Sequence, residues 1–246
     1  MEVTLYNLIE DLEQYLKYQH DNGVERVEVD HEVFRSLNQI VPVVSAVSVE
    51  KKKKIPTSFS TYEEWQKQIV QCRNCSLGQG RVFPGMGCLD LPELVFVDES
   101  PDPEITKPTA LLHGADGTLL LKMIDAMGLG LDRVFVTHVV KCAPKKDQMP
   151  KPSEWAACQP FLKEQIRLLR PKVVVAMGAT ALRSLMGTDL IFTQVRGSWQ
   201  MMNGIRVMPT YRPSTLLRDP TKKKKVWSDL KQVLTVLGKE PPVRNK

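Results

Sequence analysis

The chain has the sequence LVFVDESP at residues 94–101, where an apolar run leads directly into an acidic loop that contains proline. A short, unbroken run of Leu, Val and Phe predicts a strand that is buried on both faces of a sheet. Three further runs of this kind lie at residues 133–140, 172–177 and 206–210. Because helical stretches separate the runs, we expect an α/β three-layer sandwich around a central, mainly parallel four-stranded sheet.

The segments around these strands carry the apolar spacing and the capping residues of helices. Thr61 is placed to cap the first helix, Ser153 to cap the helix before the third strand, and Gly187 to end the helix after it. The expected helices span residues 63–70, 117–127 and 226–237, with one more from the cap at Ser153 to about Leu169 and another that follows the third strand and ends at Met186.

The alternation of strands and helices also predicts where a ligand binds. In parallel sheets covered by helices, ligands lie at the carboxyl ends of the strands. Before any chemistry is considered, this rule selects the loops at residues 98–104, 138–145, 178–180 and 210–218.

The first part of the chain differs in character from the rest. Residues 5–18 carry Leu and Ile at helical spacing, which predicts an amphipathic helix. Residues 41–58 combine proline, serine and the lysine run Lys51–Lys54, which is typical of a linker. We therefore expect a helical N-terminal extension at 1–45, a linker at 46–59, a main domain at 60–240 and a tail at 241–246.

The composition narrows the classes of protein. The 246 residues are 42% hydrophobic and 25% charged, with no apolar run long enough to span a membrane. The N-terminal residues lack the basic start and apolar core of a signal peptide, so we expect a cytoplasmic protein. The net charge of +6 is typical of chains that meet nucleic acid, although a lysine run is also compatible with a solvated face.

The five cysteines form a pattern. Cys72 and Cys75 are a C-x-x-C pair, and Cys142 and Cys158 are separated by 15 residues. In a reducing compartment such a pattern indicates metal binding rather than disulfides, and thiolates suit an iron–sulfur cluster or zinc. Cys88 lies in a glycine-rich loop and is interpreted as a small packing residue.

These cysteines belong to a longer series of motifs. The series begins with C-x-x-C-x-L-x-x-x-R from Cys72 to Arg81, followed by PGMG. The later pieces are GADGTLL, THVVKC, P-x-E before Cys158, and PTYRPSTLLR at residues 209–218. In order and spacing, from residue 72 to about residue 238, the motifs resemble those of the iron–sulfur uracil-DNA glycosylases, often called family four.

The resemblance implies a compact sheet with helices on both faces and a 4Fe–4S cluster held by Cys72, Cys75, Cys142 and Cys158, with zinc as the alternative metal. It also implies DNA as the partner and a pocket that receives a base flipped out of the duplex. We expect a monomer, and the N-terminal helix is a candidate surface for a protein partner.

Several positions depart from the family motifs. The family's Gly-Glu-Ala-Pro-Gly is DESPD at residues 98–102, so aspartates replace both glycines. Leu112 stands where the family has the phenylalanine on which the base stacks. His138 replaces the asparagine that reads the base, and Arg212 replaces the histidine that stabilises the leaving uracil anion.

The resemblance gives two groups of candidate site residues. Glu99, His138 and Arg212 are the candidate catalytic residues: a carboxylate that positions water, an imidazole that reads the base, and a cation for an anionic base or a phosphate. A structural role is the alternative for Glu99 and His138, and a plain phosphate contact for Arg212. The candidates for contact with substrate and DNA are Ser100, Leu112, Ser214 and Arg218, followed by the lysine run Lys222–Lys225.

Three functions are compatible with these motifs. The first is a DNA glycosylase of the base-excision type with altered or reduced activity on uracil. The second is a catalytically inactive, glycosylase-like protein that binds DNA, and the third is a scaffold in a repair complex that docks through residues 1–45. The altered positions favour changed or lost uracil activity, whereas the retained Glu99 and Ser214 favour an enzyme.

Overall fold

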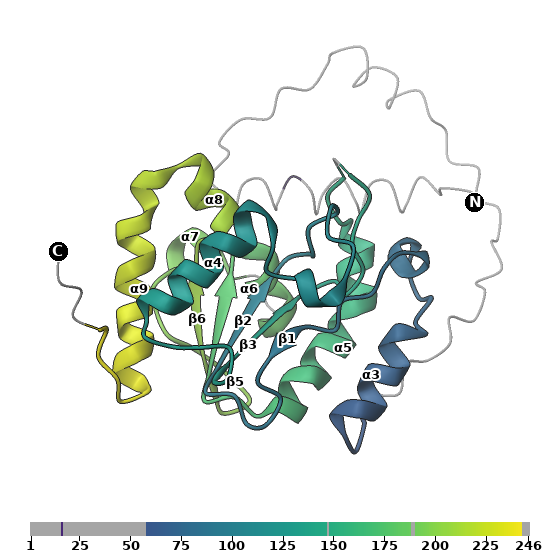
Figure 1. Ribbon diagram of the computed structural model, residues 1–246, viewed down its shortest axis with the longest axis horizontal. Coiled ribbons are helices and arrows are strands. Elements are labelled where there is room, and N and C mark those ends of the chain that lie inside the picture. The colour runs from purple at the N-terminus through teal and green to yellow at the C-terminus, as the bar shows by residue number, and fades with distance from the viewer. Residues whose placement is uncertain (1–15, 17–57, 147, 188–189, 243–246) are drawn as a thin grey trace, which may run out of the picture.

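The computed structural model describes residues 16, 58–146, 148–187 and 190–242, which form a sheet between two sets of helices (Figure 1). The strands are β1 (Met86–Gly87), β2 (Leu94–Asp98), β3 (Val134–His138), β4 (Val173–Met177), β5 (Gln200–Met202) and β6 (Ile205–Thr210). The helices are α3 (Tyr62–Val70), α4 (Gly114–Ala126), α5 (Pro152–Leu169), α6 (Ala179–Met186), α7 (Phe192–Val195), α8 (Pro213–Arg218) and α9 (Lys223–Val236). Short 3-10 helices lie at Ser76–Gln79, Pro108–Ala110 and Pro220–Lys222.

The strand order across the sheet is β1-β3-β2-β4-β6-β5. The four central strands run parallel, and β1 and β5 pair antiparallel at the two edges. The predicted four-stranded sheet is therefore corrected to a mixed sheet of six strands. The two edge strands have only two and three residues and are partly exposed, so they leave no recognisable apolar run in the sequence.

Each face of the sheet has its own hydrophobic core. Val95 and Val97 of β2 pack in one core with side chains of α5 and α6. Leu94 and Phe96 alternate with them and pack in the other core with α4 and α9. All residues of β2, β3 and β4 are buried, so the burial of these strands on both faces, predicted from the apolar runs, is confirmed.

The helix ends agree only in part with the capping signals. Thr61 caps α3 as predicted, because its Oγ1 accepts a hydrogen bond from the Glu64 amide at 3.2 Å. Helix α5 begins at Pro152, so Ser153 is not its cap; the fixed φ of proline suits the first helical position. Helix α9 begins at Lys223, and three lysines therefore occupy its first turn.

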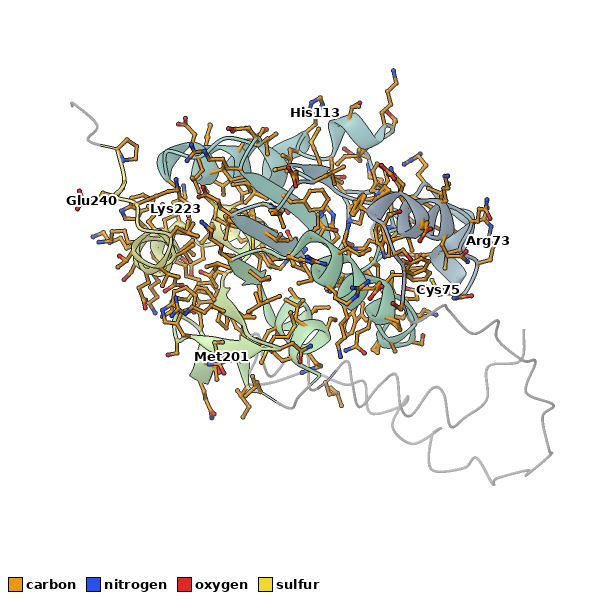
Figure 2. All side chains as sticks on the ribbon, turned by 90° about the horizontal axis from the view of Figure 1, so that it is seen from below. Arg73, Cys75, His113, Met201, Lys223 and Glu240 are labelled. Atoms are coloured by element: carbon orange, nitrogen blue, oxygen red, sulfur yellow. The ribbon has the colours of Figure 1, made fainter. Side chains whose placement is uncertain are left out.

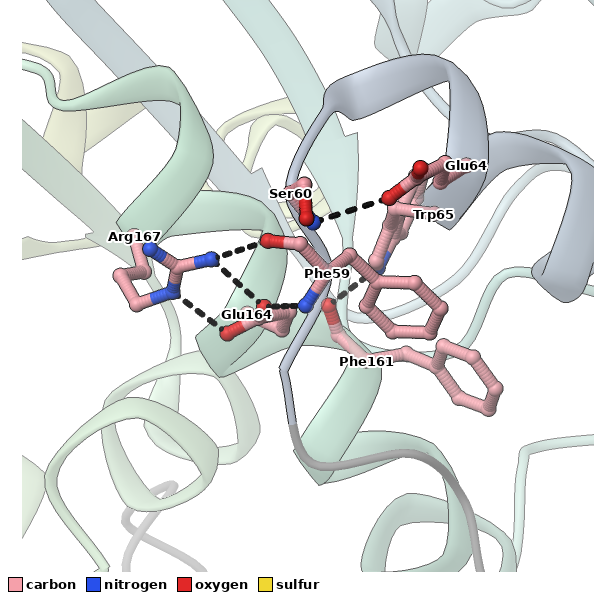
Figure 3. A network of polar contacts seen from close by, with 7 residues as sticks. All are labelled: Phe59, Ser60, Glu64, Trp65, Phe161, Glu164 and Arg167. Atoms are coloured by element: carbon pink, nitrogen blue, oxygen red, sulfur yellow. Dashed lines mark hydrogen bonds and ion pairs between the residues drawn. The ribbon is translucent and has the colours of Figure 1, made fainter.

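The beginning of the described domain is tied to α5 (Figure 3). The Phe59 amide donates to the Glu164 carboxylate at 2.6 Å, and Arg167 donates to the Phe59 carbonyl, also at 2.6 Å. The Trp65 indole donates to the Phe161 carbonyl at 2.9 Å. These contacts hold α3 and the residues before it against the α5 side of the sheet.

Most of the expected extension at 1–45, linker at 46–59 and tail at 241–246 lies outside the described residues. None of the helices in the described part of the chain combines the length and the apolar character that crossing a membrane requires.

Candidate active site at the carboxyl ends of the strands

A cavity of about 320 Å³ lies at the carboxyl ends of β2, β3 and β6, within the range of volumes that small ligands occupy. Asp98 ends β2, His138 ends β3, and Arg212 follows β6. Leu112, just before α4, and Asp116, in the first turn of α4, line another part of the wall. Three of the four loops that the sequence selected therefore meet at one cavity.

Arg212 joins two carboxylates at the end of β2. Its Nε donates to Asp98 Oδ1 at 2.6 Å, and its Nη1 donates to Glu99 Oε2. The Glu99 carboxylate is buried and also accepts a hydrogen bond from Thr180 Oγ1 at 3.1 Å. The positive charge of Arg212 is thus matched by two acids of the same loop.

The path of Arg212 depends on a glycine at the end of β4. Gly178 has a φ of +89°, a conformation that glycine adopts without strain. A Cβ atom at this position would lie 2.8 Å from both Cγ and Cδ of Arg212. Because β4 lies between β2 and β6, this glycine lets the arginine stem cross to the acids on the far side.

His138 is buried, and its ring lines the cavity. Burial, together with the charges of Lys141 and Arg212, lowers the pKa of this imidazole to about 3, so the ring is neutral near pH 7. Within the described residues its Nδ1 atom has no hydrogen-bond partner. An unpaired buried polar atom costs about 1–3 kcal/mol, so a bound molecule that brings a polar group to this ring gains from the contact.

A buried lysine fixes the backbone of His138. Lys141 Nζ donates to the His138 carbonyl at 2.5 Å and, at 2.7 Å each, to Thr137 Oγ1 and to Gln165 Oε1. The side chain is fully buried, and burial lowers the pKa of its amine to about 7. Gln165 belongs to α5, so the same network ties that helix to the end of β3.

The cavity wall is acidic. Asp98, Asp102 and Asp116 line it, together with the guanidinium of Arg212. Asp116 lies in the first turn of α4, where burial and the nearby charge of Asp98 raise the pKa of its carboxyl. Asp102 Oδ1 accepts a hydrogen bond from the Glu104 amide at 2.8 Å.

The other residues selected from the sequence lie in different places. Ser100 and Leu112 line the cavity. Glu99 is not part of the lining and reaches the site through its pair with Arg212. Ser214 and Arg218 belong to α8, outside the lining, and the side chain of Arg218 is exposed.

Four cysteines gather away from the cavity lining. Burial, together with the charges of the neighbouring cysteines, raises the pKa of Cys142 to about 12. Burial, with a smaller contribution from Cys75 and Cys72, raises the pKa of Cys158 to about 11. None of the four is in a disulfide, whereas Cys88 donates to the Asp90 carbonyl at 3.3 Å. In the described part of the chain, no group of three or more His, Cys, Asp or Glu side chains is arranged to hold a single metal ion. Figure 2 shows Cys75 and Lys223 at opposite ends of the molecule.

Known protein families were compared with the chain, and the result agrees with this fold. The family model for the uracil DNA glycosylase superfamily aligns with residues 84–231, which include the sheet and the whole cavity lining. The chain belongs to the uracil DNA glycosylase superfamily. The family expected from the sequence motifs is thereby confirmed.

Several members of this superfamily are similar over most of the chain. A type-4 uracil-DNA glycosylase of Sulfurisphaera tokodaii is 35% identical over 186 residues, covering 71% of this chain and 84% of the relative. A type-4 uracil-DNA glycosylase of Thermotoga maritima is 36% identical over 182 residues, covering 71% of this chain and 93% of the relative.

Three residues that shape the candidate site were not selected from the sequence. Thr180 holds Glu99, and it lies in the loop at 178–180 that the carboxyl-end rule had already marked. Asp116 carries part of the acidic wall, and only its place in the first turn of a helix that begins at the cavity could have indicated it. Lys141 stood within a recognised motif, but its burial has no signal in the sequence.

The neutral state of His138 predicts a dependence of stability on pH. The unfolded imidazole takes up a proton below about pH 6.5, whereas the folded one stays neutral down to about pH 3. The unfolded state therefore binds more protons in this window, and stability falls as the pH falls through it. Between pH 7.5 and pH 5.5 we expect the wild type to lose about 1 kcal/mol more than His138→Asn. Urea denaturation at the two pH values measures this, and equal losses in both proteins contradict it.

Proposed function

We propose that the chain is a DNA glycosylase that receives a flipped base in the cavity beside His138 and Arg212, and that uracil is a poor substrate for it. The main support for the proposal is that Arg212 forms ion pairs with Asp98 and Glu99 at the wall of this cavity. The similarity to enzymes named type-4 uracil-DNA glycosylases supports the reaction class.

The paired acids suit hydrolysis of an N-glycosidic bond. As the bond breaks, the sugar acquires oxocarbenium character, and nearby carboxylates favour this positive charge. Glu99 is the candidate to orient the attacking water, and its hydrogen bond from Thr180 fixes the carboxylate for that role.

Uracil is disfavoured at the same site. It leaves as an anion and needs donors whose charge is available to it. The charge of Arg212 is already matched by two carboxylates. Leu112 offers no aromatic face, and stacking of a base on an aromatic ring is worth about 1–3 kcal/mol.

The second candidate function is binding of DNA without cleavage of the glycosidic bond. Both oxygens of the Glu99 carboxylate already accept hydrogen bonds, one from Thr180 and one from Arg212. An acid held in this way activates water less readily than a free one. The third candidate, a scaffold that docks through residues 1–45, depends on a segment outside the described residues.

The four gathered cysteines fit an iron–sulfur cluster. Their thiols act on one another electrostatically, lie partly or fully buried, and form no disulfide. Each thiolate of a 4Fe–4S cluster binds a different iron atom, so the four ligands need not converge on one point. Cys72, Cys75, Cys142 and Cys158 would hold the cluster, which would tie the loop after α3 to the segment that includes α5.

Base release from oligonucleotides tests the proposed activity. We expect the wild type to remove uracil far more slowly than the Thermotoga maritima relative assayed in parallel. Among the described residues, no Phe, Tyr or Trp ring lines the cavity for the base to stack on, and Arg212 is already paired with two carboxylates. The triple variant Leu112→Phe, His138→Asn, Arg212→His is expected to release uracil faster than the wild type. Alkali-labile sites in single-stranded and duplex substrates, with uracil, hypoxanthine, xanthine or an alkylated base, report the release. Uracil removal as fast as that of the relative contradicts the proposal, and intact DNA binding with no base released supports the second candidate.

Metal analysis tests the cluster. Protein purified without oxygen is expected to be brown and to contain about four iron atoms per chain. Cys142→Ser should lose the metal, while Cys88→Ser, the matched control, should retain it. A colourless protein with about one zinc ion per chain would replace the iron assignment but keep the four ligands.

Three exposed lysines in the first turn of α9, Lys223, Lys224 and Lys225, are candidates for contact with DNA phosphates. Positive charges at a helix N-terminus oppose the helix dipole, by about 0.3–1 kcal/mol each. Replacing all three with Gln should therefore leave the melting temperature unchanged or raise it, while weakening DNA binding and flattening its salt dependence. Lys231→Gln, exposed on the same helix, serves as the control. Unchanged DNA affinity at low and moderate salt would remove this turn from the DNA-binding surface.

A further inference from the structure

The cavity wall carries more negative than positive charge. Among the described residues of the lining, Asp98, Asp102 and Asp116 face a single guanidinium, that of Arg212. Arg212 is paired with Asp98 and with Glu99 before any ligand binds. The carboxylates of Asp102 and Asp116 therefore give the described lining an excess of negative charge.

Of these acids, Asp116 has the fewest favourable contacts for its negative charge. Within the described residues it takes part in no hydrogen bond or ion pair, and its burial raises the pKa of its carboxyl. Two positive charges act on it: Arg212, which is engaged elsewhere, and Arg218, which is exposed and screened by solvent. A cation in the cavity would supply the positive charge that the described residues do not bring to Asp116.

His138 is an independent sign that the cavity takes a ligand. It is only 7% exposed and lines the cavity, yet its Nδ1 has no hydrogen-bond partner among the described residues. Because the ring is neutral, it does not repel a cation. A neutral imidazole offers one donor and one acceptor to the polar edge of a base.

We infer that the cavity takes a flipped base that carries a positive charge, the class formed when a ring nitrogen of a purine is alkylated. This inference rests on the proposed glycosylase function and narrows its substrate. Charges interact more strongly where water is largely excluded. The acidic wall therefore favours a cationic base over a neutral one such as uracil.

The charge of the base also changes what the site must do. Water adds its oxygen to C1′ of the sugar and gives one proton to the solvent. The bond between C1′ and the purine nitrogen breaks, and its electron pair passes to the purine and cancels the positive charge. Because the base leaves neutral, no group has to stabilise an anion, and the engagement of Arg212 is no obstacle.

Affinities for duplexes that resist cleavage test the inference without requiring the base to be released. Two duplexes carry N7-methylguanine or guanine at one position, each on a sugar whose 2′-fluorine slows cleavage of the glycosidic bond. We expect the wild type to bind the N7-methylguanine duplex about tenfold more tightly, a difference of about 1.4 kcal/mol. Equal affinities, or no binding to either duplex, overturn the inference.

Substitutions in the acidic wall test whether its negative charge causes the preference for the cationic base. Asp102→Asn and Asp116→Asn each remove one charge with little change of shape, and both should reduce the preference for the cationic base. Asp125→Asn makes the same change at an exposed position of α4 and should leave the preference intact. A preference that survives both wall substitutions overturns the electrostatic explanation.

Excision from unfluorinated duplexes separates this inference from the proposed function. We expect N7-methylguanine to be released faster than uracil. Faster release of uracil keeps the glycosylase function but overturns the inference. Release of no base, together with a preference in binding, rejects the glycosylase function and keeps the cationic selectivity of the cavity.

Discussion

The arrangement of the candidate site depends on two ion pairs, which Arg212 forms with Asp98 and with Glu99. They connect the loop after β6 to the loop after β2, across the end of β4, and Gly178 leaves room for the arginine stem. A buried carboxylate without a partner is costly, so the pair with Arg212 stabilises Glu99 in its buried position. The same pairing removes the one guanidinium of the described lining from the set of charges available to a ligand.

A second buried network supports the neighbouring strand. The amine of Lys141 has three acceptors around it and fixes the backbone at His138 from the side of α5. Cys142 follows directly in the chain, and Cys158 lies in α5. The region of the cysteines and the cavity are therefore linked through a few residues of β3 and α5, and a metal cluster in that region would stiffen the support of the site.

The departures from the family motifs act together in the structure. The aspartates at 98 and 102 and the arginine at 212 are not independent changes, because Asp98 binds Arg212 and Asp102 lies in the same wall. An arginine in place of a histidine adds charge, and a new aspartate beside it neutralises that charge. The result is a cavity with an acidic wall, a neutral imidazole and an aliphatic side chain at position 112.

The sequence by itself determined the four central strands, the main helices and the family. Apolar runs predicted the four central strands, because burial on both faces leaves a local pattern, and the carboxyl-end rule located three of the loops that line the cavity. The edge strands β1 and β5 were missed because they are too short to carry such a pattern.

Only the tertiary structure decided how the site is charged. Arg212 meets Asp98 and Glu99 across 114 and 113 positions of the chain, and these pairs have no local signature. The same holds for the Nδ1 atom of His138, which has no hydrogen-bond partner among the residues that the structure describes. Periodicity reports which face of an element is buried, whereas the charge and hydrogen bonding of a cavity depend on which distant side chains the fold brings together.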